Sequence, residues 1–220
     1  MDTRRLANEA DPKPRRGGSR EAIVDAAQQL FLQRGFGSVS MDELAEAAGV
    51  ARRTLYNQFA SKEEIFREML LGVSGRLEHA FPPGIETQGG VEEVLRAVGR
   101  MIVELHRHRD YLGFLRMVAA DARQFPWIAE ELASVMDPVM ERFVRYLALQ
   151  TELGILDCRN PLLATHQLAG MLNEFSLWPW LMGRETIPVP EEEVIEESVR
   201  MFLSHYRRVR PQKRGRDDET

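Results

Sequence analysis

The sequence predicts an all-α protein that consists of two helical domains. Apolar residues recur at the three- and four-residue spacing of helices along most of the chain, and no useful length of sequence alternates with the two-residue period of a strand. The segment FPPGIETQGG at residues 81–90 is the clearest interruption of that pattern. We therefore expect one domain at residues 18–79 and a second at residues 80–208.

The two ends of the chain are expected to lie outside these domains. Residues 1–17 mix Pro, Gly, Arg and Lys with few apolar side chains, which is typical of a flexible basic arm, and residues 209–220 form a polar tail. The start lacks the apolar run of a secretory signal, and no stretch approaches the ~18 apolar residues of a membrane span. The single cysteine, Cys158, excludes an internal disulfide framework. We therefore expect a cytoplasmic protein.

Charge is unevenly distributed along the chain. The net charge of −5 argues against a protein that coats nucleic acid indiscriminately. Residues 12–62 nevertheless hold eight Lys or Arg against five Asp or Glu, a local charge of +3 that leaves −8 for the remainder. A mildly basic N-terminal part on an otherwise acidic protein would present one positively charged face to a polyanion.

The first domain is expected to open with a helix over about residues 19–34, which Gly35 ends. The stretch that follows, Ser40 to Phe59, predicts two short helices joined by a tight turn. Ser40 and Glu43 have the spacing of a capping box, and Gly49 supplies the positive φ that ends a helix. The second short helix is about 12 Å long, which matches the width of a B-DNA major groove.

That arrangement is the layout of a helix-turn-helix, although an ordinary helical hairpin with a solvated outer face has the same pattern. A second capping box, at residues 61–64, predicts a long helix that leads out of the first domain. The second domain is expected to contain helices at about residues 91–108, 110–124, 127–153, 161–182 and 190–207. Pro138 should interrupt the third of these, and Pro179 should kink or end the fourth near Trp178.

Residues 19–66 resemble the N-terminal DNA-binding domain of the TetR family of transcriptional regulators. The resemblance rests on the Ala-Ala and Leu-Phe pairs of the first helix, the Gly35-Phe36 turn, Gly49-Val50, the Thr54-Leu55-Tyr56 run and Ser61-Lys62-Glu63. Arg53 departs from the pattern, because the family often has a small residue there. The resemblance implies that the second short helix enters the major groove and that a homodimer binds a pseudo-palindromic site.

The outer face of that helix carries side chains suited to DNA. Arg52 and Arg53 can fork onto guanine or contact phosphate, while Thr54 and Asn57 suit short hydrogen bonds to bases or backbone. Tyr56 can donate to a phosphate, and Ser40 and Lys62 lie at helix N-termini, where free amides favour an anion. For each residue the alternative is solvated surface. The expected DNA-binding residues are Ser40, Arg52, Arg53, Thr54, Tyr56, Asn57 and Lys62.

The second domain is rich in methionine and aromatic residues, most of which are expected to form its core. A flexible methionine-lined cavity also suits varied apolar ligands. Residues 114–132 resemble the regulatory domain of one TetR subgroup, which implies a domain that binds a small apolar ligand and forms the dimer. The candidate pocket residues are Met101, Leu105, Phe114, Met117, Phe125, Met140, Phe143, Phe175 and Trp178.

The last two helices carry apolar stripes that family analogy assigns to a dimer interface. Packing within one chain is the alternative, and both can hold because an amphipathic helix can bury two faces. The candidate interface residues are Leu168, Leu172, Val194, Val199, Phe202 and Tyr206.

No motif of an enzyme is present. The sequence lacks G-x-S-x-G, a P-loop, G-x-G-x-x-G and H-E-x-x-H. His106 and His108, two residues apart, would point in different directions from a helix and make a poor metal pair. We expect no catalytic residue, no metal site and no cofactor.

The sequence therefore predicts a ligand-responsive, sequence-specific transcriptional regulator, a repressor that a small molecule releases from its operator. Its expected partners are double-stranded DNA, a second copy of the chain and an unidentified small apolar ligand, with no membrane. The alternatives are a helical small-molecule-binding protein without DNA function and an activator of the same fold.

Overall fold

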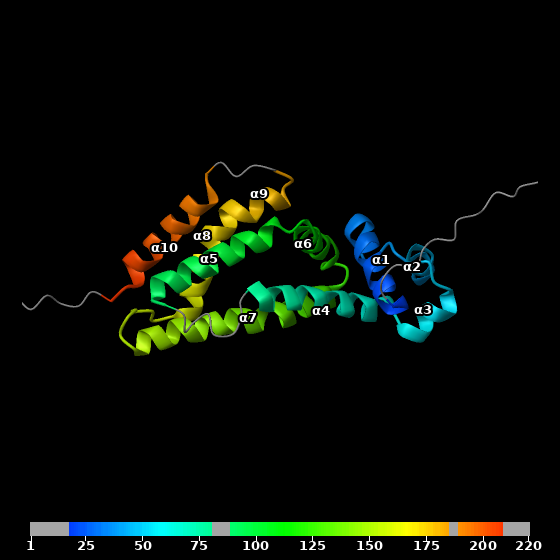
Figure 1. Cartoon of the computed structure of the whole chain (residues 1–220), viewed down its shortest axis with the longest axis horizontal. Helices are drawn as coiled ribbons and strands as arrows, with labels where there is room; N and C mark the ends of the chain where they lie inside the picture. The colour runs from blue at the N-terminus through cyan, green and yellow to red at the C-terminus, as the bar shows by residue number, and fades with distance from the viewer. Residues whose placement is uncertain (1–17, 81–88, 185–188, 209–220) are drawn as a thin grey trace, which may run out of the picture.

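A computed structural model describes residues 18–80, 89–184 and 189–208, and these residues confirm the all-α prediction: they contain helices and no strand (Figure 1). The expected basic arm and polar tail lie outside the described residues. The helices are α1 Ser19–Arg34, α2 Met41–Ala48, α3 Arg52–Gln58, α4 Lys62–Ala80, α5 Val91–Arg107, α6 Arg109–Asp121, α7 Pro126–Glu152, α8 Pro161–Ser176, α9 Trp178–Leu181 and α10 Glu191–Tyr206. None of the described helices combines the length and apolar character that a bilayer crossing requires.

The two prolines predicted to disturb helices behave differently. Pro179 ends α8 at Ser176, as expected, and the chain then makes the short helix α9. The interruption expected at Pro138 was wrong, because α7 runs unbroken from Pro126 to Glu152. Pro138 deprives the Ser134 carbonyl of its amide partner, and Ser134 is exposed, so water can reach that carbonyl. Packing on either side keeps the helix together.

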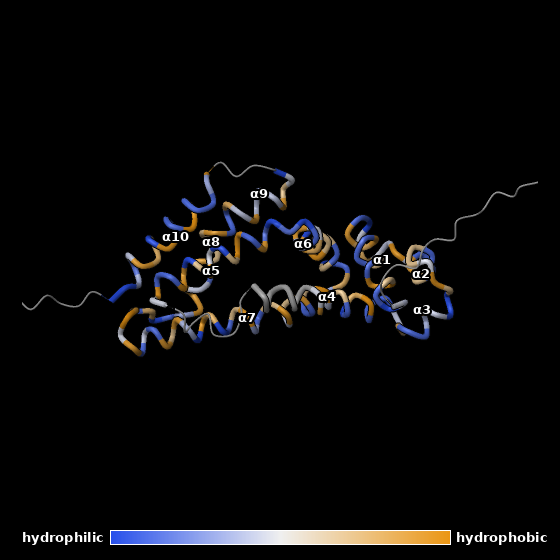
Figure 2. Tube along the Cα trace, viewed as in Figure 1, coloured by the Kyte–Doolittle hydropathy of each residue, from blue (hydrophilic) through white to orange (hydrophobic). Residues whose placement is uncertain are grey.

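Two large apolar cores follow one another along the molecule. Figure 1 shows α1–α3 at one end of an elongated shape, and apolar and polar residues alternate along the helices in Figure 2. The first core joins α1–α4 to α6 and the start of α7, and the second joins α5, α7, α8 and α10. The first core includes Phe114, Met117 and Ile128, so it takes residues from both sides of the division expected at residues 79 and 80.

The turn between α1 and α2 is where α6 and α7 contact the N-terminal helices. The Phe36 ring is fully buried, and its centroid lies 5.3 Å from that of Phe125 and 5.1 Å from that of Trp127. The Phe36 amide donates a 2.6 Å hydrogen bond to the Asp121 carboxylate at the end of α6. Gly37 lies so close that a Cβ there would be 2.9 Å from the Phe125 ring. The corner between α6 and α7 therefore holds the turn between α1 and α2 in place by both apolar and polar contacts.

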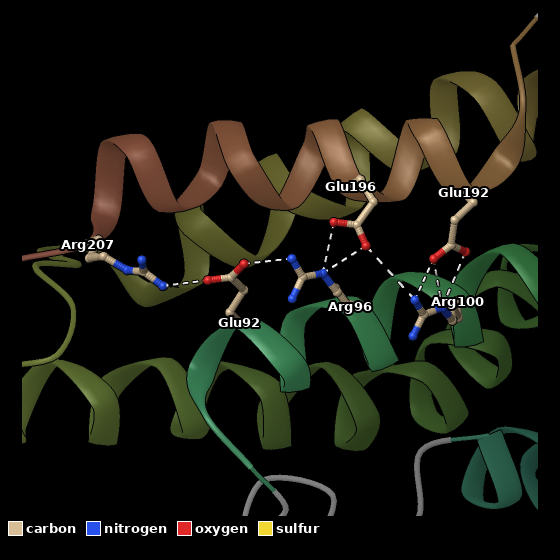
Figure 3. A network of polar contacts seen from close by, with 6 residues as sticks. All are labelled: Glu92, Arg96, Arg100, Glu192, Glu196 and Arg207. Atoms are coloured by element: carbon tan, nitrogen blue, oxygen red, sulfur yellow. Dashed lines mark hydrogen bonds and ion pairs between the residues drawn. The ribbon is translucent and has the colours of Figure 1, made fainter.

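Helix α10 packs along α5, and a row of ion pairs connects the two helices (Figure 3). Gly99 permits the close approach, because a Cβ at that position would be 2.9 Å from a methyl carbon of Ile195. The ion pairs are largely exposed, so each contributes little on its own and apolar burial dominates. The row consists of Glu92, Arg96, Arg100, Glu192, Glu196 and Arg207.

Candidate nucleic-acid interface

Helix α2 begins with the predicted capping box. The Ser40 hydroxyl accepts from the Glu43 amide at 3.3 Å, and the Glu43 carboxylate accepts from the Ser40 amide at 2.8 Å. Hydrogen bonds from the Ser40 amide and hydroxyl, and then from Arg34, lower the pKa of Glu43 to about 2. Gly49 has φ 67° and ψ 32°, the left-handed conformation that ends the helix and sets the turn before α3.

Helix α3 is anchored by apolar residues on one side and exposes polar residues on the other. Leu55 and Phe59 are buried in the first core, with exposures of 0% and 1%. Arg52, Arg53, Tyr56 and Asn57 are exposed and Thr54 is half-buried, so all five predicted residues of this helix reach the surface. The amphipathic pattern thus orients α3 with its polar face outward.

The two arginines at the start of α3 differ in their contacts. The Arg52 guanidinium lies 3.0 Å from the Asp42 carboxylate, in a pair whose side chains are 71% and 46% exposed. Arg53 forms no ion pair with any residue that the structure describes. Its five N–H donors are therefore free of internal acceptors in the described part of the chain and available to a partner.

Ser40, Tyr56 and Lys62 come together around one shallow hollow. It measures about 550 Å³, and Gly37, Ser61 and the start of α4 complete its wall. The hollow lies between the N-termini of α2 and α4, where amides without helical partners favour an anion. Glu63 also lines the hollow, so the positive charge that a phosphate needs comes from the free amides and the Lys62 ammonium.

Lys62 has a structural contact that the sequence did not suggest. Its ammonium donates to the carbonyl oxygens of Phe36 and Val39, each at 2.9 Å, and lies 4.4 Å from the centroid of the Phe36 ring. An ammonium has three N–H donors, so one remains for a ligand in the hollow. Lys62 therefore ties α4 to the turn between α1 and α2, whatever it contacts outside.

The candidate pocket residues are divided among the apolar clusters of the described structure. Phe114 and Met117 are buried in the first core and Phe125 packs against it, while Phe143 is buried in the second core with Met101 and Phe175 at its edge. Leu105 belongs to a small cluster between the cores, Met140 is half-buried, and Trp178 is 49% exposed.

The six candidate interface residues all pack inside their own chain. Leu168, Leu172, Val194, Val199, Phe202 and Tyr206 belong to the second core, and none of them is more than 8% exposed. The alternative of packing within one chain thus accounts for this side of α8 and α10. Other apolar residues on these helices face outward, namely Leu162, Leu163 and Met201, which are 53%, 51% and 58% exposed.

Sequence reasoning missed a buried polar group near the end of α5. His106, Tyr111 and Ser176 are 4%, 4% and 2% exposed, and the His106 Nδ1 atom lies 2.8 Å from the Ser176 hydroxyl. The only signal in the sequence was a histidine and a serine at apolar positions of their helices. No cluster of three possible metal ligands occurs in the part of the chain that the structure describes.

These features define a class of protein before any comparison. The chain is all-α, its α2–α3 pair is a helix-turn-helix, and α3 exposes arginine, tyrosine and asparagine beside an anion-favouring hollow. A second and larger group of helices follows it. This is the architecture of a helix-turn-helix DNA-binding protein with an attached helical body.

Comparison with known proteins gives the family. Residues 23–69 match the tetR family of bacterial regulatory proteins. Residues 93–208, more than half of the chain, match the C-terminal domain of AefR-like transcriptional repressors. The chain belongs to the TetR family, as its first helices predicted, and it is a DNA-binding transcriptional regulator.

Individual relatives agree over most of the chain. The solved structure of the flavonoid-responsive regulator FrrA is 27% identical, with a TM-score of 0.72, and the match covers 86% of this chain and 97% of that one. A TetR family regulator from Pseudomonas syringae pv. tomato is 30% identical, with a TM-score of 0.69, over 86% of this chain and 96% of that one. The regulator YvkB of Bacillus subtilis is 21% identical over 82% of this chain and 93% of its own length.

Proposed function

We propose that two copies of the chain bind a pseudo-palindromic operator, repress transcription there, and leave it when a small molecule binds the helical body. The observation that carries this proposal is the exposed polar face of α3, which begins with Arg52 and Arg53 and lies beside the hollow of Ser40, Tyr56 and Lys62. In this arrangement α3 enters the major groove, while the hollow receives a backbone phosphate next to the groove.

The side chains divide into two roles. Arg53 reads a base, because its free guanidinium can form two hydrogen bonds to guanine O6 and N7. Arg52 must first leave Asp42, so it suits a phosphate better than a base. Tyr56 and the remaining N–H of Lys62 contact phosphate, and the Ser40 hydroxyl can join them only by turning away from the Glu43 carboxylate. Thr54 and Asn57 make shorter contacts at the groove. Phosphate contacts set the position of α3, and Arg53 supplies the sequence preference.

The dimer interface in this proposal is the outward face of α8 and α10. Leu163 and Met201 are exposed apolar residues on two helices that pack against each other. Gly170 lies about two helical turns beyond Leu163, on the same face of α8. Nothing outside the backbone of its own helix lies within 4 Å of where a Cβ would be, so a partner helix can come close. Burial of large exposed apolar side chains is the driving force for such an association. Met201→Glu should therefore shift the protein toward monomer in sedimentation, while Glu141→Lys on α7 should not.

The class of ligand is suggested by one relative and by the body itself. FrrA is described as flavonoid-responsive, and it is 27% identical to this chain across nearly its whole length. Methionine and aromatic residues between the two cores can adapt to a planar apolar molecule. We infer that the effector is a small and largely apolar organic compound.

Selection from a random duplex library at two salt concentrations tests the proposal. An inverted repeat should be enriched, and an activator of the same fold would also enrich one, so a reporter with the site placed over its promoter separates the two. Arg53→Ala should weaken operator binding by ~1–3 kcal/mol and relax the preference at one base pair per half-site. Arg145→Ala, on the exposed side of α7, is the matched control and should change neither. Salt-dependent binding without an enriched sequence would leave a ligand-binding protein as the better description.

A further inference from the structure

Three polar residues meet in the apolar region between the two cores. His106 is at the end of α5, Tyr111 is in the first turns of α6, and Ser176 ends α8. The His106 and Tyr111 rings are stacked, with centroids 6.1 Å apart and planes 18° from parallel. A histidine buried among apolar side chains is most often a core residue with both nitrogens satisfied, so its hydrogen bonds decide what it can do.

The hydrogen bonds assign the proton of the His106 ring. The Ser176 hydroxyl lies 2.9 Å from the Leu172 carbonyl oxygen, which can only accept, so the hydroxyl proton is used there. The Ser176 hydroxyl oxygen also lies 2.8 Å from Nδ1 of His106. Because the hydroxyl proton is already used, Nδ1 must be the donor in that contact. Burial lowers the pKa of His106 to about 4, so the ring is neutral near pH 7. A neutral imidazole that carries its proton on Nδ1 leaves Nε2 as an acceptor.

Two atoms of this group lack partners. Neither Nε2 of His106 nor the Tyr111 hydroxyl has a hydrogen-bond partner among the residues that the structure describes. In that same part of the chain every fully enclosed polar side-chain atom does have one. Both atoms therefore keep some access to solvent, although the two residues are only 4% exposed. An almost buried acceptor beside an almost buried hydroxyl is a place where a ligand can gain hydrogen bonds.

The surroundings of this group belong to both cores. Tyr111 and Leu105 form a small buried cluster with half-buried apolar residues packed around it. Of these neighbours, Leu115 and Val135 also pack against the first core, and Val139 also packs against the second. Met136 completes the set and is flexible enough to make room. A molecule placed here would press on the core that holds α1–α4.

We propose that His106 and Tyr111 bind the effector, and that the effector is an uncharged aromatic or alicyclic compound with a hydroxyl group that donates to Nε2 of His106. This inference rests on the proposed function, because it names the ligand class of the same regulator. The apolar body of the compound lies among Leu115, Val135, Met136 and Val139. A charged ligand is disfavoured, since the neutral imidazole and the phenol offer no opposite charge. Ser176 is a positioning residue that holds the imidazole in the required tautomer.

Matched pairs of probes test the donor requirement. We would titrate the full-length protein, without DNA, with 2-naphthol and 2-methoxynaphthalene, and with 6-hydroxyflavone and 6-methoxyflavone, by isothermal calorimetry. Methylation removes only the O–H donor and keeps the aromatic body. The hydroxylated member of at least one pair should bind about tenfold more tightly than its methyl ether, because the ether leaves Nε2 unpaired.

Two variants assign the preference to this site. His106→Phe should reduce the ratio between the two affinities to about one. Tyr111→Phe removes a single hydroxyl, which can donate to a hydroxyl or an ether oxygen alike, so it should weaken both members of a pair and leave their ratio nearly unchanged. His108→Phe, at an exposed histidine two residues away, should keep the wild-type ratio. Thermal melting of each variant shows whether it folds, and Tyr111→Phe keeps the test valid if His106→Phe does not fold.

The outcomes separate this inference from the proposed function. No binding of either hydroxylated probe, equal binding within both pairs, or an unchanged ratio in His106→Phe would each overturn the site. None of these titrations needs an operator. If the probes behave as expected but no duplex is enriched, the proposed DNA function is wrong and the ligand site stands. If a duplex is enriched but the probes do not behave as expected, only the ligand site is wrong.

Discussion

Replacement of Lys62 by methionine separates two roles that a lysine at the start of α4 can have. The change keeps the length and apolar stem of the side chain but removes its charge and donors. Two carbonyl oxygens, of Phe36 and Val39, would lose their 2.9 Å partners, and the Phe36 ring would lose the ammonium that lies 4.4 Å from its centroid.

The magnitude follows from these contacts. A hydrogen bond from a charged donor contributes about 1.5–3 kcal/mol, and a partly exposed cation–π contact about 0.5–1 kcal/mol. Lys62 is half-buried beside an open hollow, so water can replace part of what is lost at the two carbonyls. We therefore expect Lys62→Met to lower the free energy of unfolding by about 2 kcal/mol, measured by urea denaturation.

Salt dependence of operator binding then reports on the third N–H. If that N–H contacts a phosphate, the slope of log affinity against log salt falls by about one unit in Lys62→Met. An unchanged slope with weaker binding would mean that Lys62 acts only by holding the turn between α1 and α2. Unchanged stability with a lower slope would refute the structural role of Lys62.

Three other perturbations have expected outcomes. Gly99→Ala should lower the free energy of unfolding in urea by about 1–3 kcal/mol through overpacking against α10. Gly72→Ala, where a Cβ would have nothing within 4 Å, should raise it. Equal effects of the two substitutions would contradict the close approach of α5 and α10 at Gly99. Because His106 is neutral when folded, the unfolded state binds more protons between pH 6.5 and about 4, so stability should fall by roughly 3 kcal/mol as the pH drops through that window. His106→Phe should lose that part of the pH dependence, and an unchanged slope would exclude the buried neutral ring. Asp121→Ala should lower the melting temperature more than Asp110→Ala, at an exposed position of the same helix, because only Asp121 accepts from Phe36.

Features set by neighbouring residues could be predicted from the sequence. The capping box of Ser40 and Glu43, the left-handed Gly49 and the polar face of α3 each depend on spacings of a few residues, and the structure shows all three. The prolines show the limit of such local reasoning. A single missing amide ended α8 before Pro179 but did not break α7 at Pro138, where packing along the whole helix outweighed it.

Features set by distant residues could not be predicted. The partners of Lys62 lie 26 and 23 residues away, and the Ser176 partner of His106 lies 70 residues away. The apolar stripe of α10 showed that Val199 and Phe202 would be buried, but a stripe does not reveal whether its own chain or a second copy covers it. The candidate pocket residues are divided between the two cores for the same reason, since composition does not place residues relative to one another.

The contact of the α6–α7 corner with the turn between α1 and α2 bears on how this family can be recombined. Phe36 packs against Phe125 and Trp127, and its amide is held by Asp121, so the N-terminal helices carry an apolar surface shaped for this particular body. A chimera that joins residues 18–80 to the body of another regulator would leave those groups facing foreign side chains. Exchange of operator specificity in this protein should therefore be attempted by substitutions on the outer face of α3, and a graft of the whole unit would have to bring residues 121–128 with it.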